Sequence, residues 1–361
     1  MTKSISLVFF MTILLNPLFA QQARSVVTLT KDPAGLFKSY KFFIENVEDQ
    51  RPQPGAALGK VIALGREIPA VFADKAESEL FGYWSYLAPK KEQAHLPLYI
   101  TIKELSVSEK RIGPNRVTGE VRLNVRFRWY RDMLPVELTG YQTAANYTRP
   151  ETAFTHDKLI KQIVDQALSH FQKWMTSNTG KTPALARNLV LTFKEINNTA
   201  SEDTVFYSPK RPLVWDDFKV RSAKPGSRYA AAVFTSFGYE GRSYPKDDDL
   251  VVEIGLKTFM VKSMSWGRPD SRNAGTLRHE QIHFDITRLV VEKFKERLRK
   301  AELTFEDYDS EIQYQFLEAF REMNRDQEQY DGETGHGLNE GVQAAWDKKV
   351  AQQIEALYSV Q

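Results

Sequence analysis

The chain has 361 residues, of which 42% are hydrophobic and 26% are charged, as expected for a globular protein long enough to form two domains. Its formal net charge is only +3, from 49 basic and 46 acidic residues, so the concentrated basic surface of a nucleic-acid-binding protein is not expected. The chain contains no cysteine, which excludes disulfides and restricts any metal site to His, Asp and Glu side chains and water.

The first 20 residues predict a secretory signal peptide. Lys3 supplies a positive start, residues 5–15 are apolar, and Leu18-Phe19-Ala20 fits a cleavage site before Gln21. This apolar run is short for a bilayer span, and no later stretch is long and apolar enough to cross a membrane. We therefore expect cleavage after Ala20 and a periplasmic or secreted protein without a stable membrane span.

Residues 21–178 are predicted to form an N-terminal α+β domain of unknown role, in which helices accompany an antiparallel sheet. The clearest strand is Val117–Tyr130, where apolar residues alternate with polar and basic ones from Glu120 to Trp129. The other predicted elements are strands at Leu96–Val107 and Val136–Tyr147 and helices at Val71–Tyr83 and His156–Met175.

The second half of the chain predicts a separate domain of the same α+β class. Ser177–Pro183 is rich in turn-forming residues and indicates a boundary. We interpret residues 179–209 as a connector and residues 210–361 as a zincin-like domain with a small sheet and three long helices. Its predicted elements are strands at Tyr229–Tyr239 and Leu250–Lys262 and helices at Ala274–Lys300, Thr304–Gln329 and Asn339–Leu357.

The first of these helices contains the segment RHEQIHFDITRL, which begins at Arg278. His279 and His283 are four residues apart and therefore lie on one face of a helix, the spacing with which H-E-x-x-H metalloproteases bind zinc. Glu280 lies about 100° around the helix from His279. From there it can take a proton from a zinc-activated water as general base. The segment predicts a Zn²⁺ cofactor bound by the two histidines, with Glu280 as the catalytic residue.

A catalytic zinc site normally needs a third protein ligand. The leading candidate is His336, which lies in the glycine-rich segment Tyr330–Asn339, where backbone freedom allows a side chain to turn inward. The alternative is Glu306, on the acidic helix that follows. Asp331 and Glu333 are further candidates.

Tyr330 begins the same glycine-rich segment. Its hydroxyl group could donate a hydrogen bond to the oxyanion that develops during hydrolysis, which would make it a second catalytic residue. The alternative interpretation is a tyrosine that packs within the fold. The sequence alone leaves both open.

Two segments resemble a bacterial family of predicted secreted zinc-dependent proteases, which is a domain of unknown function. These segments are LRHEQIHFDI and YDGETGHGLNEGVQAAWD, and LVWDDFKV, YAAAVFTSFGY and the MSW of Met264–Trp266 also fit. The resemblance extends over about residues 210–357 and leaves the first domain outside. It implies that His279 and His283 bind zinc and that Glu280 is the catalytic acid.

The leading hypothesis is a secreted zinc-dependent hydrolase, specifically a peptidase that acts on a peptide or protein and holds it along a strand edge. A cell-wall amide hydrolase with the same site is one alternative. The other is a non-catalytic binding or scaffold protein of the cell envelope, favoured by the basic strand face of Arg122, Arg126 and Arg128. The partner of the first domain is not predicted.

Overall fold

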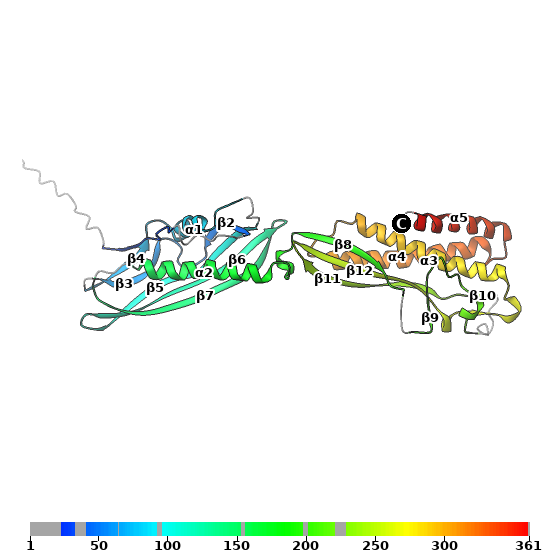
Figure 1. Cartoon of the computed structure of the whole chain (residues 1–361), viewed down its shortest axis with the longest axis horizontal. Coiled ribbons are helices and arrows are strands. Elements are labelled where there is room, and N and C mark those ends of the chain that lie inside the picture. The colour runs from blue at the N-terminus through cyan, green and yellow to red at the C-terminus, as the bar shows by residue number, and fades with distance from the viewer. Residues whose placement is uncertain are drawn as a thin grey trace, which may run out of the picture. The chain divides into compact units, whose positions relative to one another are not determined.

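The computed structural model describes residues 23–32, 41–63, 65–91, 96–152, 156–197, 201–220 and 229–359. The predicted signal peptide lies outside these described residues. The chain divides into two compact units between Ser177 and Asn178, and both combine helices with sheets (Figure 1). The chain is therefore of mixed α+β class, as predicted.

The first unit is built on a seven-stranded sheet. Its strands are β1 (Ser25–Val27), β2 (Phe42–Asp49), β3 (Ala57–Ala63), β4 (Arg66–Phe72), β5 (Leu96–Gly113), β6 (Arg116–Arg131) and β7 (Leu134–Pro150). The strand order is β1-β4-β3-β5-β6-β7, and β2 pairs with β5. The β1–β4, β2–β5 and β3–β5 pairs are parallel, so the predicted antiparallel sheet is mixed. Alternating side chains indicate which face of a strand is buried, but they do not specify its partner.

The apolar face of β6 forms part of the core, as its alternation predicts. Val121, Leu123, Val125 and Phe127 are fully buried, and Phe127 stacks on Phe171 with ring centroids 4.8 Å apart. The helices of this unit are α1 (Ala76–Leu87) and α2 (Asp157–Asn178). The prediction of a helix at Val71–Tyr83 is wrong at its start, because Val71 pairs with Ala57 of β3 and Phe72 pairs with Val27 of β1.

A network of buried charged and polar side chains connects strands β5 and β7 of this unit. Glu109 of β5 accepts hydrogen bonds from Nε and Nη2 of Arg149 at 2.8 and 2.7 Å and from the Tyr147 hydroxyl at 2.7 Å. His156 Nε2 lies 3.0 Å from the same carboxylate. Burial alone would raise the pKa of Glu109, but the hydrogen bonds from His156 and Arg149 outweigh it and hold the pKa well below its ordinary value.

Replacement of Glu109 by Gln should lower the free energy of unfolding of the first unit by about 3–5 kcal/mol, because the buried Arg149 loses its counter-charge. The matched control is Glu67→Gln, whose side chain is 63% exposed beside Lys60 and should contribute less than about 1 kcal/mol. Hydrogen exchange of peptides from β5 and β6 in increasing urea measures both. Equal effects of the two substitutions would contradict a structural role for the network.

The stabilisation by Glu109 should also depend on pH. Because its pKa is lowered in the fold, the stabilisation is present at neutral pH and is lost as the pH falls below the unfolded-state value. The difference in unfolding free energy between wild type and Glu109→Gln should therefore shrink below about pH 5. The same exchange experiment, repeated at pH 7, 5 and 3.5, measures this, and a constant difference would contradict it.

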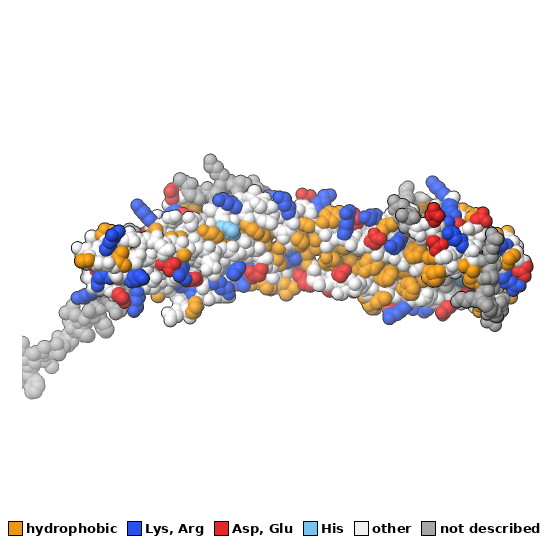
Figure 2. Space-filling model, turned by 90° about the horizontal axis from the view of Figure 1, so that it is seen from below, with side chains coloured by type: hydrophobic (Ala, Val, Ile, Leu, Met, Phe, Trp, Pro, Cys, Tyr) orange, Lys and Arg blue, Asp and Glu red, His pale blue; other side chains and the backbone are white. Residues whose placement is uncertain are grey.

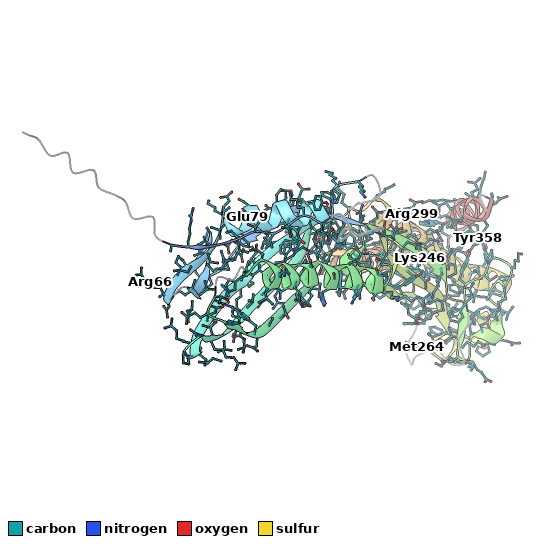
Figure 3. All side chains as sticks on the ribbon, turned by 60° about the vertical axis from the view of Figure 1, so that its left-hand side comes forward. Arg66, Glu79, Lys246, Met264, Arg299 and Tyr358 are labelled. Atoms are coloured by element: carbon teal, nitrogen blue, oxygen red, sulfur yellow. The ribbon has the colours of Figure 1, made fainter. Side chains whose placement is uncertain are left out.

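The second unit contains a four-stranded and a two-stranded sheet. The strands are β8 (Asn188–Glu195), β9 (Thr204–Phe206), β10 (Ala231–Ala232), β11 (Thr235–Lys246), β12 (Asp249–Val261) and β13 (Trp266–Gly267). The larger sheet has the order β11-β12-β8, and β9 also pairs with β12. Lys246, labelled in Figure 3, is the last residue of β11 and pairs with Asp249 across the tight turn to β12.

Residues 179–209, which we predicted as a connector, are part of this unit. β8 runs parallel to β12, with Leu191 opposite Val252, and β9 pairs with the far end of β12. Turn-forming residues lie on both sides of β8, and for this reason the segment was predicted as a connector. There is no local sign in the sequence that this short strand joins a sheet built from residues much later in the chain.

The unit contains three long helices, as predicted: α3 (Ala274–Lys300), α4 (Tyr308–Thr334) and α5 (Glu340–Ser359). Of these, α3 and α4 pack against the larger sheet. The core joins Val290, Phe294 and Leu298 of α3 to apolar side chains of β12 and α4. α3 also contacts α5. This packing brings the first half of α3, the last turn of α4 and the first turns of α5 together.

The surface of the second unit carries hydrophobic side chains as well as charged ones (Figure 2). On α4, the exposed large hydrophobic residues Tyr314, Leu317 and Phe320 recur at every third position. Within the described part of the chain, no helix combines the length and the apolar character that crossing a membrane requires.

Candidate metal centre

Helix α3 positions the residues of the H-E-x-x-H segment. The Asn273 side chain caps its N-terminus by accepting a hydrogen bond from Thr276 N–H at 2.9 Å. His279, Glu280 and His283 follow in the second and third turns and are all buried. The helical repeat brings the two imidazole rings together, with centroids 5.0 Å apart.

The last turn of α4 brings Asp331 to these rings. α4 continues through Gly332 and ends at Gly335, whose φ of 56° and ψ of 41° form a left-handed cap that bonds back to Asp331 O. We expected residues 330–339 to be a loop. The helix instead continues to Thr334, because its buried face, including Tyr330, outweighs the weak helix propensity of Gly332.

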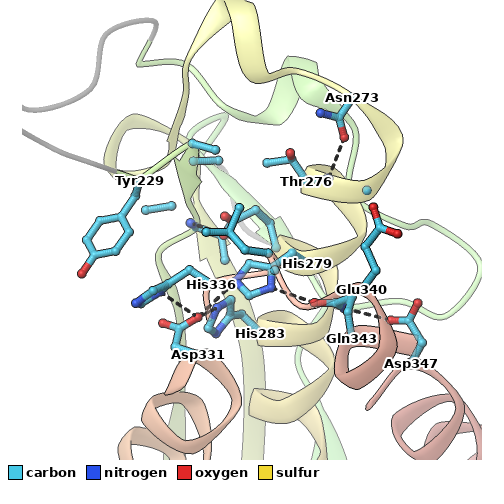
Figure 4. Close-up of a pocket in the computed structure, with 18 of the residues that line it drawn as sticks. Tyr229, Asn273, Thr276, His279, His283, Asp331, His336, Glu340, Gln343 and Asp347 are labelled. Atoms are coloured by element: carbon cyan, nitrogen blue, oxygen red, sulfur yellow. Dashed lines mark hydrogen bonds and ion pairs between the residues drawn. The ribbon is translucent and has the colours of Figure 1, made fainter. Parts of the chain in front are cut away.

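The two histidines and Asp331 converge on one point, as Figure 4 shows. The Nε2 atoms of His279 and His283 each lie 3.1 Å from Asp331 Oδ1. Within the described residues, these three form a group whose potential ligand atoms all lie within 4.8 Å of one another. The structure therefore assembles two imidazole nitrogens and a carboxylate oxygen from two helices.

His336, our leading candidate for the third ligand, is near this group but does not belong to it. Its Nδ1 lies 3.4 Å from Asp331 Oδ1, and its side chain is 40% exposed. His336 adopts a left-handed backbone conformation with φ of 57°, and its ring lies against Tyr229 with centroids 4.4 Å apart. The group that could hold a metal ion therefore contains Asp331, which we ranked lower, and does not contain His336.

Glu306 is excluded as a ligand by its position. It precedes Tyr308, the first residue of α4, whereas Asp331 lies in the last turn of this helix. A helix of 27 residues is about 40 Å long, so Glu306 lies far from the histidines. Acidic residues occur along the whole of this helix, so the sequence alone did not show which of its ends lies beside the histidines.

Tyr330 packs within the fold. It is fully buried and stacks on the His279 ring with centroids 4.7 Å apart. Its hydroxyl donates a hydrogen bond to Gln343 Oε1 at 2.9 Å. The structure thus favours the packed tyrosine over the oxyanion donor.

Glu280 lies beside the group without being part of it. Its Oε2 accepts a hydrogen bond from Val233 N–H at 2.8 Å, which ties the carboxylate to the segment after β10. Burial raises the pKa of Glu280, and the nearby charges of His283 and His279 offset only part of this effect. The Glu280 carboxylate is therefore fixed in place, and it holds a proton more tightly than the same group would in water.

The charges of the group support one another. Burial works against ionisation of Asp331, but hydrogen bonds with His279 and His283 outweigh it and hold the Asp331 pKa well below its ordinary value. Burial would likewise lower the pKa of His279, but the hydrogen bond with Asp331 and the charge of Glu280 raise it. The site is thus arranged to hold positive charge between two imidazoles and a carboxylate.

This donor set fits a divalent metal ion. Neutral imidazole and carboxylate are both common zinc ligands, with bond lengths of about 2.0–2.2 Å, so neighbouring donors in a tetrahedral shell are about 3.3–3.5 Å apart. The separations of 3.1 Å between each Nε2 and Oδ1 differ from this by a few tenths of an ångström. All three donor atoms lie within 4.8 Å of one another, so a metal ion bound between them would replace these hydrogen bonds.

A pocket of ≈ 690 Å³ opens onto these residues and is lined by His279, Glu280, His283 and Asp331. Its other walls come from residues 229–233, the start of α3, residues 336–338 and the first turns of α5. This volume is within the range of pockets that bind small molecules or parts of larger substrates.

Sequence analysis missed the residues that support the group from outside. Gln343 Oε1 lies 3.1 Å from His279 Nδ1. The Thr287 hydroxyl interacts with Thr235 at 2.8 Å and with Gln327 at 3.1 Å, which links α3, β11 and α4. None has a recognisable spacing, although Gln343 lies within the segment YDGETGHGLNEGVQAAWD that carries the family resemblance.

Asp331→Ala should weaken zinc binding by on the order of 100-fold or more, because one of three ligands is lost. His336→Ala is the matched variant in the same segment and should change the zinc dissociation constant by no more than a few-fold. Competition with a chromophoric chelator measures both constants. A larger loss for His336→Ala than for Asp331→Ala would restore His336 as the third ligand.

The comparisons with known proteins find similarity to a bacterial family of unknown function over a shorter span than the resemblance. The family model described as "Bacterial protein of unknown function (DUF922)" matches residues 263–337, which include α3 and Asp331. No curated protein matches the chain. The solved structures include a protein from Xanthomonas campestris that matches the DUF330 family model. It is 12% identical to this chain, with a TM-score of 0.28, and the alignment covers 43% of this chain and 97% of that one. Such a low score supports no conclusion, so the similarity of residues 263–337 to a family of unknown function is the finding that bears on the site.

Proposed function

We propose that the second unit is a zinc-dependent hydrolase of the peptidase type, with His279, His283 and Asp331 as metal ligands and Glu280 as general base. The observation that carries this proposal is the convergence of two imidazoles and a carboxylate beside a buried glutamate, at the base of one pocket. A structural site would be expected to use four protein ligands, whereas three leave a position open.

Each residue would have a separate task. When bound, zinc supplies Lewis acidity, which polarises a carbonyl group and lowers the pKa of water. His279 and His283 would hold it through neutral nitrogen atoms, and Asp331 would contribute one negative charge. Glu280 would accept the proton of the attacking water and deliver it to the leaving amine. The Val233 hydrogen bond would keep its carboxylate oriented for this transfer.

The short strand in the pocket wall is compatible with an extended substrate. Residues Ala230–Ala232 line it with small side chains, and β10 pairs with β13 along one of its edges. An extended peptide could add to this short strand through backbone hydrogen bonds, a common mode of peptide recognition. This favours a peptide or protein over a compact small molecule.

Glu280→Gln should retain zinc but reduce the turnover of denatured casein by about 10²–10⁴-fold, because the amide cannot accept the proton of water. Glu296→Gln, an exposed position on the same helix, is the matched control and should retain wild-type turnover. The measurement is the rate of peptide release from fluorescent casein with the zinc content determined in parallel. Undiminished turnover in Glu280→Gln would remove this residue from the mechanism.

Peptidoglycan is the second substrate to be tested, since the same site could hydrolyse a cell-wall amide. Parallel incubation with casein and with purified peptidoglycan distinguishes the two, and we expect new amino groups from casein. Release from peptidoglycan alone would replace the peptidase by a cell-wall amide hydrolase. Stoichiometric zinc with activity on neither substrate would favour a binding or scaffold role.

We further propose that the chain is exported, because its N-terminal residues have the charge and apolar pattern of a signal peptide. Expression of the full chain in a Gram-negative host should give a periplasmic product that begins at Gln21. Cell fractionation followed by N-terminal sequencing tests this. A cytoplasmic product that retains Lys3 would contradict it.

A further inference from the structure

The amide of Gln343 connects the first turns of α5 to His279. Its Oε1 lies 3.1 Å from His279 Nδ1 and accepts the Tyr330 hydroxyl at 2.9 Å, while its Nε2 donates to Asp347 Oδ1 at 3.2 Å. Figure 4 shows the line of contacts from Asp331 through His279 and Gln343 to Asp347. We call the contacts of this amide the Gln343 bridge.

The chemistry of its partners fixes the orientation of this amide. The Asp347 carboxylate is paired with Arg278, whose Nε donates to it at 3.1 Å, and an ionised carboxylate can only accept hydrogen bonds. The NH₂ group of Gln343 must therefore face Asp347. The carbonyl oxygen consequently faces Tyr330 and His279, and since it can only accept, His279 Nδ1 must carry a proton.

Protonation at Nδ1 determines what the other nitrogen of His279 can do. A neutral ring protonated at Nδ1 presents a lone pair at Nε2, the nitrogen that faces Asp331 at 3.1 Å. A lone pair and a carboxylate oxygen repel each other unless a cation lies between them. The bridge therefore prepares Nε2 as a metal ligand, or as a donor when the ring is charged.

We propose that Gln343 is a positioning residue, which holds His279 in the tautomer and orientation that bind the metal ion. This inference rests on the proposed metal site. The bridge distinguishes the two histidines. His279 Nδ1 has a hydrogen-bond partner, whereas His283 Nδ1 is buried without one in the described part of the chain. Such outer contacts orient metal-binding histidines and tune their affinity in many proteins.

The packing around His279 is consistent with a fixed ring. Tyr330 stacks on it with an interplanar angle of 23°. Gly337 approaches so closely that an added Cβ would lie 3.3 Å from His279 Nδ1, at a φ of 82° that disfavours any side chain. The ring is thus held by stacking, by a close backbone and by the hydrogen bond from Nδ1.

The test uses one disruptive, one restoring and one control variant of the full mature chain. Gln343→Met keeps the length of the side chain but removes the acceptor. The double variant Gln343→Glu with Asp347→Asn exchanges the acid and the amide. An oxygen still faces His279, an NH₂ group still lies behind it, the carbonyl oxygen of the new amide can turn to accept from Arg278, and the net charge is unchanged. Gln352→Met replaces an exposed glutamine on the same helix.

Gln343→Met should weaken zinc binding by about 10–100-fold, while the double variant and Gln352→Met stay within about threefold of wild type. In ¹⁵N spectra of the histidine rings, assigned with His279→Ala, Nδ1 of His279 should be protonated in wild type both with and without zinc. Unchanged zinc affinity in Gln343→Met, or an unprotonated Nδ1 in wild type, would overturn the positioning role.

The two readouts separate this inference from the proposed function. If the wild-type protein binds no zinc, the proposed function fails, and the tautomer of the neutral His279 ring in the metal-free protein still decides whether the Gln343 bridge exists. If zinc binds and casein is cleaved but Gln343→Met behaves as wild type, the proposed function survives and the positioning role does not.

Discussion

The candidate site depends on one constraint: two imidazoles on one helix must meet a carboxylate from the end of another. The helical repeat places His279 and His283 on one face of α3 without assistance from the rest of the fold. Asp331 reaches them only because α4 packs along α3 and continues until Gly335. The contacts of 3.1 Å between each ring and Asp331 Oδ1 therefore depend on how the two helices pack against each other.

The rest of the second unit holds these helices in place. Apolar side chains of β12 pack against α3 and α4, and the Thr287, Thr235 and Gln327 contacts connect the same elements closer to the site. α5 contributes Gln343, and the segment after β10 holds Glu280 through Val233 N–H. Three helices and a strand segment thus fix the polar groups that a buried site would otherwise leave unsatisfied.

Local patterns predicted the elements, and packing determined which of their ends meet. Ala274–Lys300 was predicted with both ends correct, because the apolar stripe that defines this helix is a local signal. His336 was preferred over Asp331 because it lies in a glycine-rich segment, where backbone freedom allows a side chain to turn inward. Because Gly332 has a weak helix propensity, the predicted helix ended before the last turn of α4, and Asp331 was not placed on a helix that faces the histidines. The parallel pairings of β8 and of the first sheet join segments distant in sequence, which local alternation does not encode.

The most direct test of this account is a crystal structure of the protein soaked with zinc, with diffraction recorded above and below the zinc absorption edge. The account predicts an anomalous peak about 2.0–2.2 Å from Nε2 of His279, Nε2 of His283 and Oδ1 of Asp331, with Glu280 outside the coordination shell. No peak at this position, or a peak bound by His336 in place of Asp331, would contradict it.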